Sequence, residues 1–284
     1  MRNFIRFGLW VMLLSGSLSA FAADDVKKEE VAPLPASGAI PQHPLLNDKF
    51  RVSLGGFYAD TNTSVRLDGN TGTGVEINFE DALGIDNRKL VGEAVMYWRF
   101  GERWHLGVDY FSISRSGNRT LSKDVTWGGI IYHTGTNVNS QTKISDLRTT
   151  VGYSFFKRPD KEVGAGAGLH WTGLKFSVEE TSGGNAESAS VTAPLPVVYF
   201  YSNVALTDTW AMSTRLDWLS LSYDKYSGGI RAVGFDFIYQ PYTHVAFGMG
   251  WHAMLLGLKV ENTDSRIQAN LGLHGPAGYV SYSY

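Results

Sequence analysis

The stretch from Leu90 to Ser114 constrains the fold more than any other part of the chain. It contains two runs in which apolar residues alternate with other residues, joined by the short segment Gly101-Glu102-Arg103. A period of two residues is the pattern of a β-strand whose two faces meet different surroundings. The stretch therefore predicts an antiparallel hairpin with one apolar face: Leu90, Ala94, Met96, Trp98, Phe100, Trp104, Leu106, Val108 and Tyr110. In a soluble sandwich this face would be core, whereas in a transmembrane barrel it would face lipid.

Similar runs recur from Lys49 onward and predict ten strands, with eight or twelve as alternatives if the runs divide differently. The connections are unequal. Every second turn is short (101–103, 157–161, 207–209 and 240–243), whereas two connections on the opposite side are long, 61–87 and 116–141. Short turns on one side and long loops on the other are typical of outer-membrane barrels. We therefore predict an all-β fold: a transmembrane, antiparallel, up-and-down β-barrel.

The long connections contain further strand-like segments. Within 61–87, the flanks Ser64–Leu67 and Val75–Phe79 are expected to pair as a hairpin above the barrel. Within 116–141, the portion Val125–Tyr132 is expected to prolong a strand beyond the membrane.

Aromatic residues gather beside the short turns and at the C-terminus, which favours the barrel over the sandwich. A transmembrane barrel carries a girdle of aromatic side chains at each membrane interface, whereas a sandwich has no reason to collect them at one end. The expected interface residues are Trp98, Phe100, Trp104, Tyr153, Phe155, Trp210, Tyr239, Tyr282 and Tyr284.

The first 48 residues are predicted to lie outside the barrel, which occupies 49–284. Residues 1–22 combine Arg2 and Arg6, an apolar run and Ala20-Phe21-Ala22, the pattern of a secretory signal peptide. Residues 23–48 are first charged and then spaced by prolines, without periodicity, and predict a flexible periplasmic lead-in. Export to a Gram-negative envelope follows from this arrangement.

Composition excludes several classes of function. Only 18% of the 284 residues are charged, with a formal net charge of −2, and no basic run suggests nucleic-acid binding. The absence of cysteine excludes disulfides, thiolate metal sites and cysteine catalysis. No motif for a cofactor or a metal is present, and the alternating glycines Gly164, Gly166 and Gly168 lack the context of a phosphate-binding loop.

The inward positions of the predicted strands define the candidate site. Alternation places these residues toward the lumen: Glu93, Arg99, His105, Asp109, Asp146, Arg148, His170, Tyr199, Tyr201, Arg215, Asp217, Asp236 and His252. Opposite charges in a narrow interior have to pair, because an isolated buried ion is costly. A filled, salt-bridged lumen with an envelope-structural role and a narrow polar pore for small solutes both remain open.

An enzyme of the protease or lipid A hydrolase type is the alternative, with His105, Asp109, His170 and His252 as candidate groups. No GxSxG or HExxH motif supports it, and we predict no catalytic residue. The acidic loop 76–86 is either simply solvated or holds divalent cations that bridge lipopolysaccharide phosphates.

Two local patterns resemble the bacterial outer-membrane β-barrel superfamily. The sequence ends on an alternating strand with aromatic Tyr284, which resembles the C-terminal signal that barrel-assembly machinery recognises, although phenylalanine is the commoner last residue. The segments Asp81-Ala-Leu83-Gly84, Tyr97-Trp-Arg99-Phe100, Arg103-Trp-His105 and Thr192-Ala-Pro-Leu-Pro196 look most like those of small porin-like barrels, among its uncharacterised members. The resemblance implies a monomer surrounded by outer-membrane lipids and lipopolysaccharide, and it assigns no catalytic residue.

Overall fold

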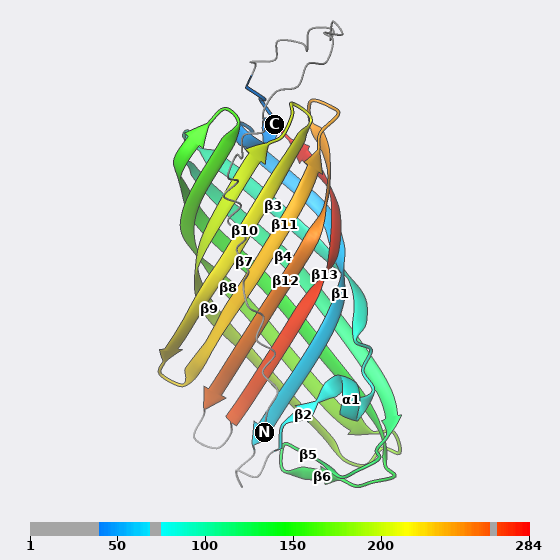
Figure 1. The fold of residues 1–284 in the computed structure, drawn as a ribbon. Helices are drawn as coiled ribbons and strands as arrows, with labels where there is room; N and C mark the ends of the chain where they lie inside the picture. Colours follow the sequence, from blue (N-terminus) through cyan, green and yellow to red (C-terminus); the bar gives the residue numbers. More distant parts are fainter. Residues whose placement is uncertain (1–39, 69–74, 262–265) are drawn as a thin grey trace, which may run out of the picture. The chain divides into compact units, whose positions relative to one another are not determined.

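The strands form one closed antiparallel barrel in chain order (Figure 1). The computed structural model describes residues 40–68, 75–261 and 266–284; the predicted signal peptide and residues 23–39 lie outside them. Pairing of the first strand with the last closes a barrel of ten strands, as predicted. Its strands are β1 (Phe50–Asp68), β3 (Arg88–Phe100), β4 (Trp104–Thr120), β7 (Asn137–Arg158), β8 (Lys161–Glu180), β9 (Ala186–Ala205), β10 (Trp210–Tyr223), β11 (Tyr226–Tyr239), β12 (Val245–Glu261) and β13 (Arg266–Ser283). No helix in the described part of the chain is long and apolar enough to cross a membrane.

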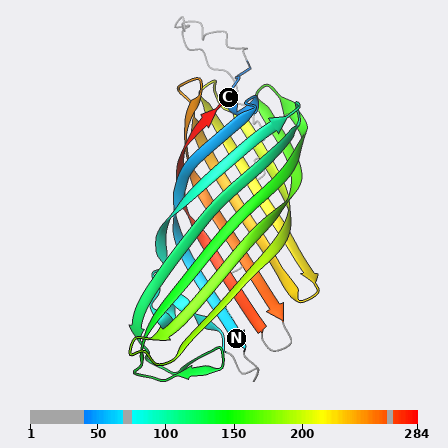
Figure 2. The ribbon, with the colours of Figure 1, turned by 180° about the vertical axis from the view of Figure 1, so that it is seen from behind.

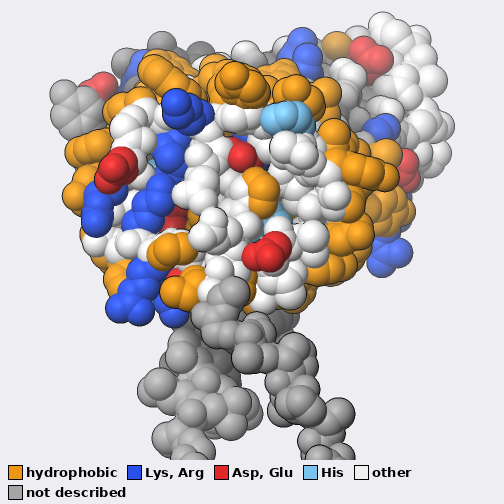
Figure 3. All heavy atoms as spheres, turned by 90° about the horizontal axis from the view of Figure 1, so that it is seen from above, with side chains coloured by type: hydrophobic (Ala, Val, Ile, Leu, Met, Phe, Trp, Pro, Cys, Tyr) orange, Lys and Arg blue, Asp and Glu red, His pale blue; other side chains and the backbone are white. Residues whose placement is uncertain are grey.

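Aromatic side chains surround the short-turn end of the barrel. Trp104 contacts Tyr153 with ring centroids 4.9 Å apart, and Trp210 stacks on Tyr239 at 4.7 Å. Viewed from this end, hydrophobic side chains gather along the outer edge, and charged side chains lie inside it (Figure 3). The predicted interface residues all project from this end of the wall, half-buried or exposed.

The opposite end carries a cap made from the two long connections (Figure 1). The first contributes the short strand β2 (Ile77–Asn78) and helix α1 (Phe79–Leu83); the second contributes the hairpin of β5 (Val125–Trp127) and β6 (Ile130–Tyr132). Phe79 packs on Trp127 with ring centroids 5.4 Å apart, so the two connections share one apolar contact. Burial raises the pKa of Tyr132 to about 12, and its hydroxyl donates to the Val178 carbonyl at 3.1 Å.

The structure refines both predictions for these connections. Ser64 and Val65 do pair with Asn78 and Ile77, but they belong to β1, which continues to Asp68. The prediction that 125–132 prolongs a barrel strand is wrong, because β5 and β6 form a separate two-stranded sheet. Gly128 and Gly129 both have positive φ, and this left-handed backbone makes the turn that folds the segment on itself.

The two faces of the wall exchange character along its height. Near the short turns, β7 presents Val151 and Tyr153 outward and Arg148 inward; farther out, it presents Lys143 outward and buries Ile144. β12 makes the same exchange: Trp251 and Leu255 are exposed outward nearer the short turns, and Lys259 points outward nearer the cap. The part of the wall nearer the short turns, the membrane band, thus has an apolar exterior, and the part nearer the cap, the extension, has an apolar core.

The membrane band has the height of a bilayer. On β12 the outward apolar positions run from Phe247 to Leu255, close to the ~9–11 residues that a tilted strand needs to cross the hydrocarbon layer. The extension above it continues the same strands and holds a buried apolar cluster that includes Phe111, Ile144, Phe176 and Leu256.

A short segment before β1 packs inside the short-turn end. The 3₁₀ helix η1 (Pro44–Leu46) follows His43, whose imidazole Nδ1 accepts the Leu45 amide at 3.1 Å. Leu45 packs in a small cluster with residues of β10, β11 and β12. Residues 43–46 fall in the stretch expected to be a flexible lead-in; in the structure their apolar side chains are buried against the barrel.

Candidate functional site

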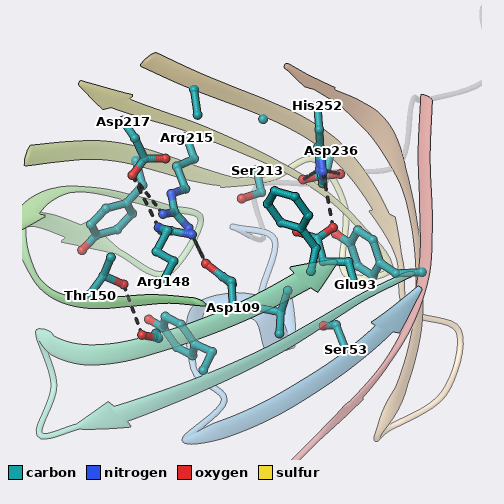
Figure 4. A pocket seen from close by; sticks show the side chains of 18 of the residues that line it. Ser53, Glu93, Asp109, Arg148, Thr150, Ser213, Arg215, Asp217, Asp236 and His252 are labelled. Carbon is teal, nitrogen blue, oxygen red and sulfur yellow. Dashed lines mark hydrogen bonds and ion pairs between the residues drawn. The ribbon is translucent and has the colours of Figure 1, made fainter. Parts of the chain in front are cut away.

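A cavity of about 300 Å³ lies inside the barrel (Figure 4). Leu45 forms part of its floor at the short-turn end, and Phe57, Phe111, Met254 and Leu273 line it toward the extension. Every predicted lumen residue except Arg99 lines this cavity: Glu93, His105, Asp109, Asp146, Arg148, His170, Tyr199, Tyr201, Arg215, Asp217, Asp236 and His252. These side chains therefore surround one internal space.

Glycines on β8 make room for the two large tyrosines of β9. A Cβ built on Gly164 would lie 2.0 Å from the Tyr201 hydroxyl, and one on Gly166 would lie 2.5 Å from the Tyr199 ring. The Tyr199 hydroxyl hydrogen-bonds the His105 imidazole at 2.9 Å. The alternating glycines thus act as packing relief, which allows the aromatic rings to lie flat against the wall.

Four side chains from three strands form an ion cluster at one side of the cavity (Figure 4). Arg148 of β7 pairs with Asp109 of β4 and lies 3.6 Å from Asp217 of β10. Arg215 donates to Asp217 at 2.9 Å and to Asp109 at 3.3 Å. Each carboxylate therefore faces two guanidinium groups, which is how a charge stays tolerable away from bulk water.

Next to this cluster, His170 is held in one orientation. Its Nδ1 lies 2.7 Å from Asp146 Oδ2, and the Thr172 hydroxyl donates to the other carboxylate oxygen at 2.6 Å. Because the carboxylate accepts, Nδ1 carries the hydrogen, and Nε2 is buried without a hydrogen-bond partner in a residue that lines the cavity. His170 is 3% exposed, so this atom can be satisfied only by something inside the barrel.

A second polar group lies across the cavity. His252 of β12 lies 3.2 Å from Asp236 Oδ1 and 3.6 Å from Glu93 Oε2, and the two carboxylates come from β11 and β3. Among the residues that line the cavity, five carboxylates face three guanidinium groups. The lining therefore has an excess of negative charge unless its histidines are protonated.

Comparison with known proteins places this architecture. No protein-family model and no curated protein matches the sequence. Among solved structures, the outer-membrane protease OmpT from Escherichia coli superposes with a TM-score of 0.58 at 10% identity, covering 88% of this chain and 100% of that chain. The translocator domain of the autotransporter NalP from Neisseria meningitidis gives 0.44 at 12% identity, covering 83% and 89%. The attachment invasion locus protein Ail of Yersinia pestis gives 0.35 at 11% identity, covering 82% and 99%.

The chain has the fold of the bacterial outer-membrane β-barrels. In such barrels the short turns are periplasmic and the long loops are extracellular, so the cap and the extension lie on the outer side and the floor on the periplasmic side. The apolar exterior of the membrane band is the surface that such barrels turn toward lipid.

Arg99 lies outside the cavity lining but inside the barrel. Its guanidinium makes a bidentate pair with Glu162, at 2.6 and 2.9 Å, near the periplasmic end. Ser154 donates to the same carboxylate and hydrogen-bonds Tyr201 at 2.8 Å. This network links β3, β7, β8 and β9 beneath the cavity and stiffens the wall there.

The outer rim of the barrel holds a buried group that the sequence did not single out. Arg115 is 2% exposed and pairs with Glu80 of α1 at 2.6 Å, and it also donates to Thr61 and Thr63. Arg115 falls on the inward parity of β4, on the same side as the expected lumen residues, but its partner Glu80 lies in the long connection between β1 and β3. Only the folded cap brings these residues together.

The acidic loop is engaged by protein groups. Glu80 pairs with Arg115, and Glu76 accepts a hydrogen bond from the Ser64 hydroxyl at 2.5 Å. Among residues 40–68, 75–261 and 266–284, no cluster of three or more histidine, cysteine or acidic side chains is arranged to hold a metal ion. The geometry offers no support for divalent cations at this loop.

Proposed function

We propose that this chain is an outer-membrane barrel for the passage of small solutes, closed at rest, with the internal cavity as its binding compartment. The observation that carries the proposal is the cavity of about 300 Å³ with the unpartnered Nε2 of the buried His170 at its wall. A barrel that serves only as envelope structure needs no such space, since close packing of the lumen would be more stable.

The two ends of the lumen support a closed resting state. Toward the outside, the cavity meets the buried apolar core, to which the cap contributes the fully buried Phe79 and Trp127. Toward the periplasm, the floor of the cavity includes Leu45, whose side chain is 4% exposed. Water and ions do not cross a packed apolar layer, so a standing aqueous pore is not expected.

Cysteine reactivity tests the proposal, because the natural chain contains no cysteine. Ser213 lines the cavity and Ser116 is exposed on the outer wall, so Ser213→Cys reports on the lumen and Ser116→Cys serves as the control. In refolded protein, we expect Ser213→Cys to react with small thiol reagents slowly but completely. Adding Leu45→Gly, which removes the floor, should accelerate reaction with a charged, water-soluble reagent about tenfold, a change of ~1.4 kcal/mol in barrier.

The same measurements can overturn the proposal. A Ser213→Cys protein that stays unreactive with and without Leu45→Gly, while its unfolded form reacts fully, would indicate a sealed structural barrel. Large steady conductance steps in a planar bilayer would instead indicate an open pore and contradict the closed resting state.

An outer-membrane enzyme of the protease or lipid hydrolase type is the second candidate, favoured by one observation. The Asp146–His170 pair, with Nε2 free, is the orienter–base arrangement that hydrolases use to activate a nucleophile. Turnover of a peptide or lipid substrate that disappears in His170→Ala and persists in His252→Ala would establish it. The likeness to OmpT is one of fold and assigns no residue.

Assembly and location form part of the same proposal. β13 ends at Ser283 and is followed by Tyr284, with Tyr282 exposed toward lipid, and we propose it as the segment that barrel-assembly machinery recognises in the outer membrane. We propose a monomer, since β1 and β13 close the sheet within one chain.

A further inference from the structure

One seam of the barrel wall is paired over only part of its height. β9 and β10 pair from Ala205 with Ala211 up to Val198 with Trp218, and no farther. Both strands continue: β9 pairs with β8 as far as Ala186, and β10 pairs with β11 as far as Tyr223. The two strands part toward the outer end of the barrel (Figure 2). We call the unpaired part, 186–197 of β9 with 219–223 of β10, the β9–β10 seam.

Two prolines explain why the pairing stops. The Ala205 amide donates toward β8, to the Asp160 carbonyl at 2.7 Å, whereas the next amide, Leu206, donates to Trp210 at 2.8 Å. Successive amides of a strand point to opposite neighbours, so the even-numbered amides of β9 point toward β10. Pro194 and Pro196 occupy even positions just beyond Val198 and have no N–H to donate. The ladder therefore ends where its donors are missing.

The seam lies at the outer edge of the membrane band. Its inner side is apolar, whereas the outward positions of β10 beyond Trp218 are Ser220 and Ser222. On the lipid side, Trp218 is 56% exposed at the last pair. On the inner side, Val197 and Leu195 of β9 are buried in the apolar core. Leu221 of β10 has the inward parity of Leu219 and Asp217, yet it is 48% exposed, so the wall is incomplete beside it. Two other ladders are also interrupted. The β1–β13 ladder lacks pairs at Tyr58 and Ala59 but resumes at Asp60 with His274. The β3–β4 ladder ends at Gly92 with Ser112, and beyond it Arg119 of β4 donates to the Asp81 carbonyl of the cap at 2.6 Å.

The cavity reaches the level directly below the seam. Asp217 and Tyr199 are register partners one residue below Trp218 and Val198, and both line the cavity. The ion cluster of Asp109, Arg148, Arg215 and Asp217 is therefore adjacent to the point where the wall opens. A molecule that entered through the seam would bring its leading end to charged groups while its body still touched leucine and valine side chains.

We propose that the β9–β10 seam is a lateral entry through which small molecules with an apolar body and one polar end pass between the outer leaflet and the cavity. The polar end reaches the ion cluster, and the apolar body lies along Leu195, Val197 and Leu219. This inference rests on the proposed passage function and names its substrate class and its path. Side-chain packing, rather than backbone hydrogen bonds, keeps the seam closed at rest, and packing contacts between leucines exchange more readily than a paired ladder.

The test compares two reagents on the Ser213→Cys protein in lipid vesicles: N-phenylmaleimide, which dissolves in lipid, and a charged, water-soluble methanethiosulfonate. Pro194→Thr with Pro196→Val restores both missing amides, and we expect it to slow N-phenylmaleimide about tenfold, with the charged reagent unchanged. Leu219→Ala removes packing at the seam, and we expect it to accelerate N-phenylmaleimide while Ser116→Cys reacts at a constant rate.

Failure of the lateral entry is distinguishable from failure of the passage function. If Ser213→Cys reacts but neither the proline substitutions nor Leu219→Ala changes the N-phenylmaleimide rate, the seam is not the path and the molecule enters elsewhere. If both reagents respond equally to the substitutions, the seam lets water through and the apolar substrate class is refuted. If Ser213→Cys is inert even with Leu45→Gly, the passage function itself fails.

Discussion

The membrane band and the extension are built from the same strands but have different surroundings. Comparing them shows which features depend on backbone pairing and which depend on the medium that the side chains face. On β8 the outward residue is Trp171 in the band and Lys175 in the extension, while the inward residue changes from His170 to Phe176. Backbone pairing with β7 continues through both regions without a break at that level. The backbone geometry therefore does not change where the two faces exchange character. Apolar side chains point outward toward lipid in the band and inward toward one another in the extension.

The difference also determines where polar function is available. In the band, the interior is polar because apolar side chains already meet lipid outside, which leaves space for the ion cluster and the cavity. In the extension, the interior is the only place where apolar side chains avoid water, so it becomes a packed core. Polar groups that could bind a ligand are consequently confined to the part of the lumen inside the membrane band.

Truncating a phenylalanine in each region should give the largest contrast. Phe176 is 1% exposed in the core of the extension, so Phe176→Ala leaves a cavity and should cost about 3–5 kcal/mol of unfolding free energy. Phe200 points outward in the band, where lipid tails fill the space that Phe200→Ala leaves. Urea unfolding of both variants from lipid vesicles measures the difference; equal losses would contradict the assignment of the two regions.

Adding a charge to the outer wall should give the next contrast, in the opposite direction. Leu216 is half exposed toward lipid near the middle of the band, and Leu216→Arg should destabilise the barrel by about 2–4 kcal/mol. Gln141 lies on the outward face of β7 in the extension, and Gln141→Arg should change the unfolding free energy by less than about 0.5 kcal/mol. A similar loss for both would place lipid around the extension as well.

The smallest expected effect concerns the floor, which like the extension buries its side chains away from water. Burial lowers the pKa of His43 below its ordinary value of 6.5, so the folded floor favours the neutral imidazole. A depressed folded pKa contributes stability above the unfolded pKa and loses it as pH falls through that value. The Ser213→Cys reaction with a charged reagent should therefore accelerate modestly as pH falls below about 6.5, after correction for the thiolate fraction measured on Ser116→Cys. The pH dependence should vanish in His43→Gln.

The sequence predicted the ten-stranded barrel because alternation and turn chemistry are local. The predicted short turn 101–103 lies between the end of β3 at Phe100 and the start of β4 at Trp104, and the charged lumen positions follow from parity alone. Alternation shows that two faces differ but not which face meets water, so the exchange at the top of the band was missed. Inward Phe111, Ile113 and Ile144 were not predicted for the same reason.

Other features depend on contacts between distant segments. The pairing of Arg115 with Glu80 and the packing of Phe79 on Trp127 join separate connections, and no local pattern specifies them. Pro194 and Pro196 were visible in the sequence as part of a family resemblance. Their consequence depends on which neighbour their missing amides would face, and that is known only once the register is known.

The unequal strand lengths give the barrel a tall and a low side. β7 has 22 residues and β11 has 14, which along tilted strands is roughly 20 Å of wall height at ~3.3 Å per residue. The outer rim is thus oblique: the cap lies on its tall side, and the β10–β11 hairpin lies on its short side. A large molecule that approaches from the cell surface, such as an antibody, would contact the cap on the tall side first. A small lipophilic molecule in the outer leaflet would contact the short side, near the β10–β11 hairpin.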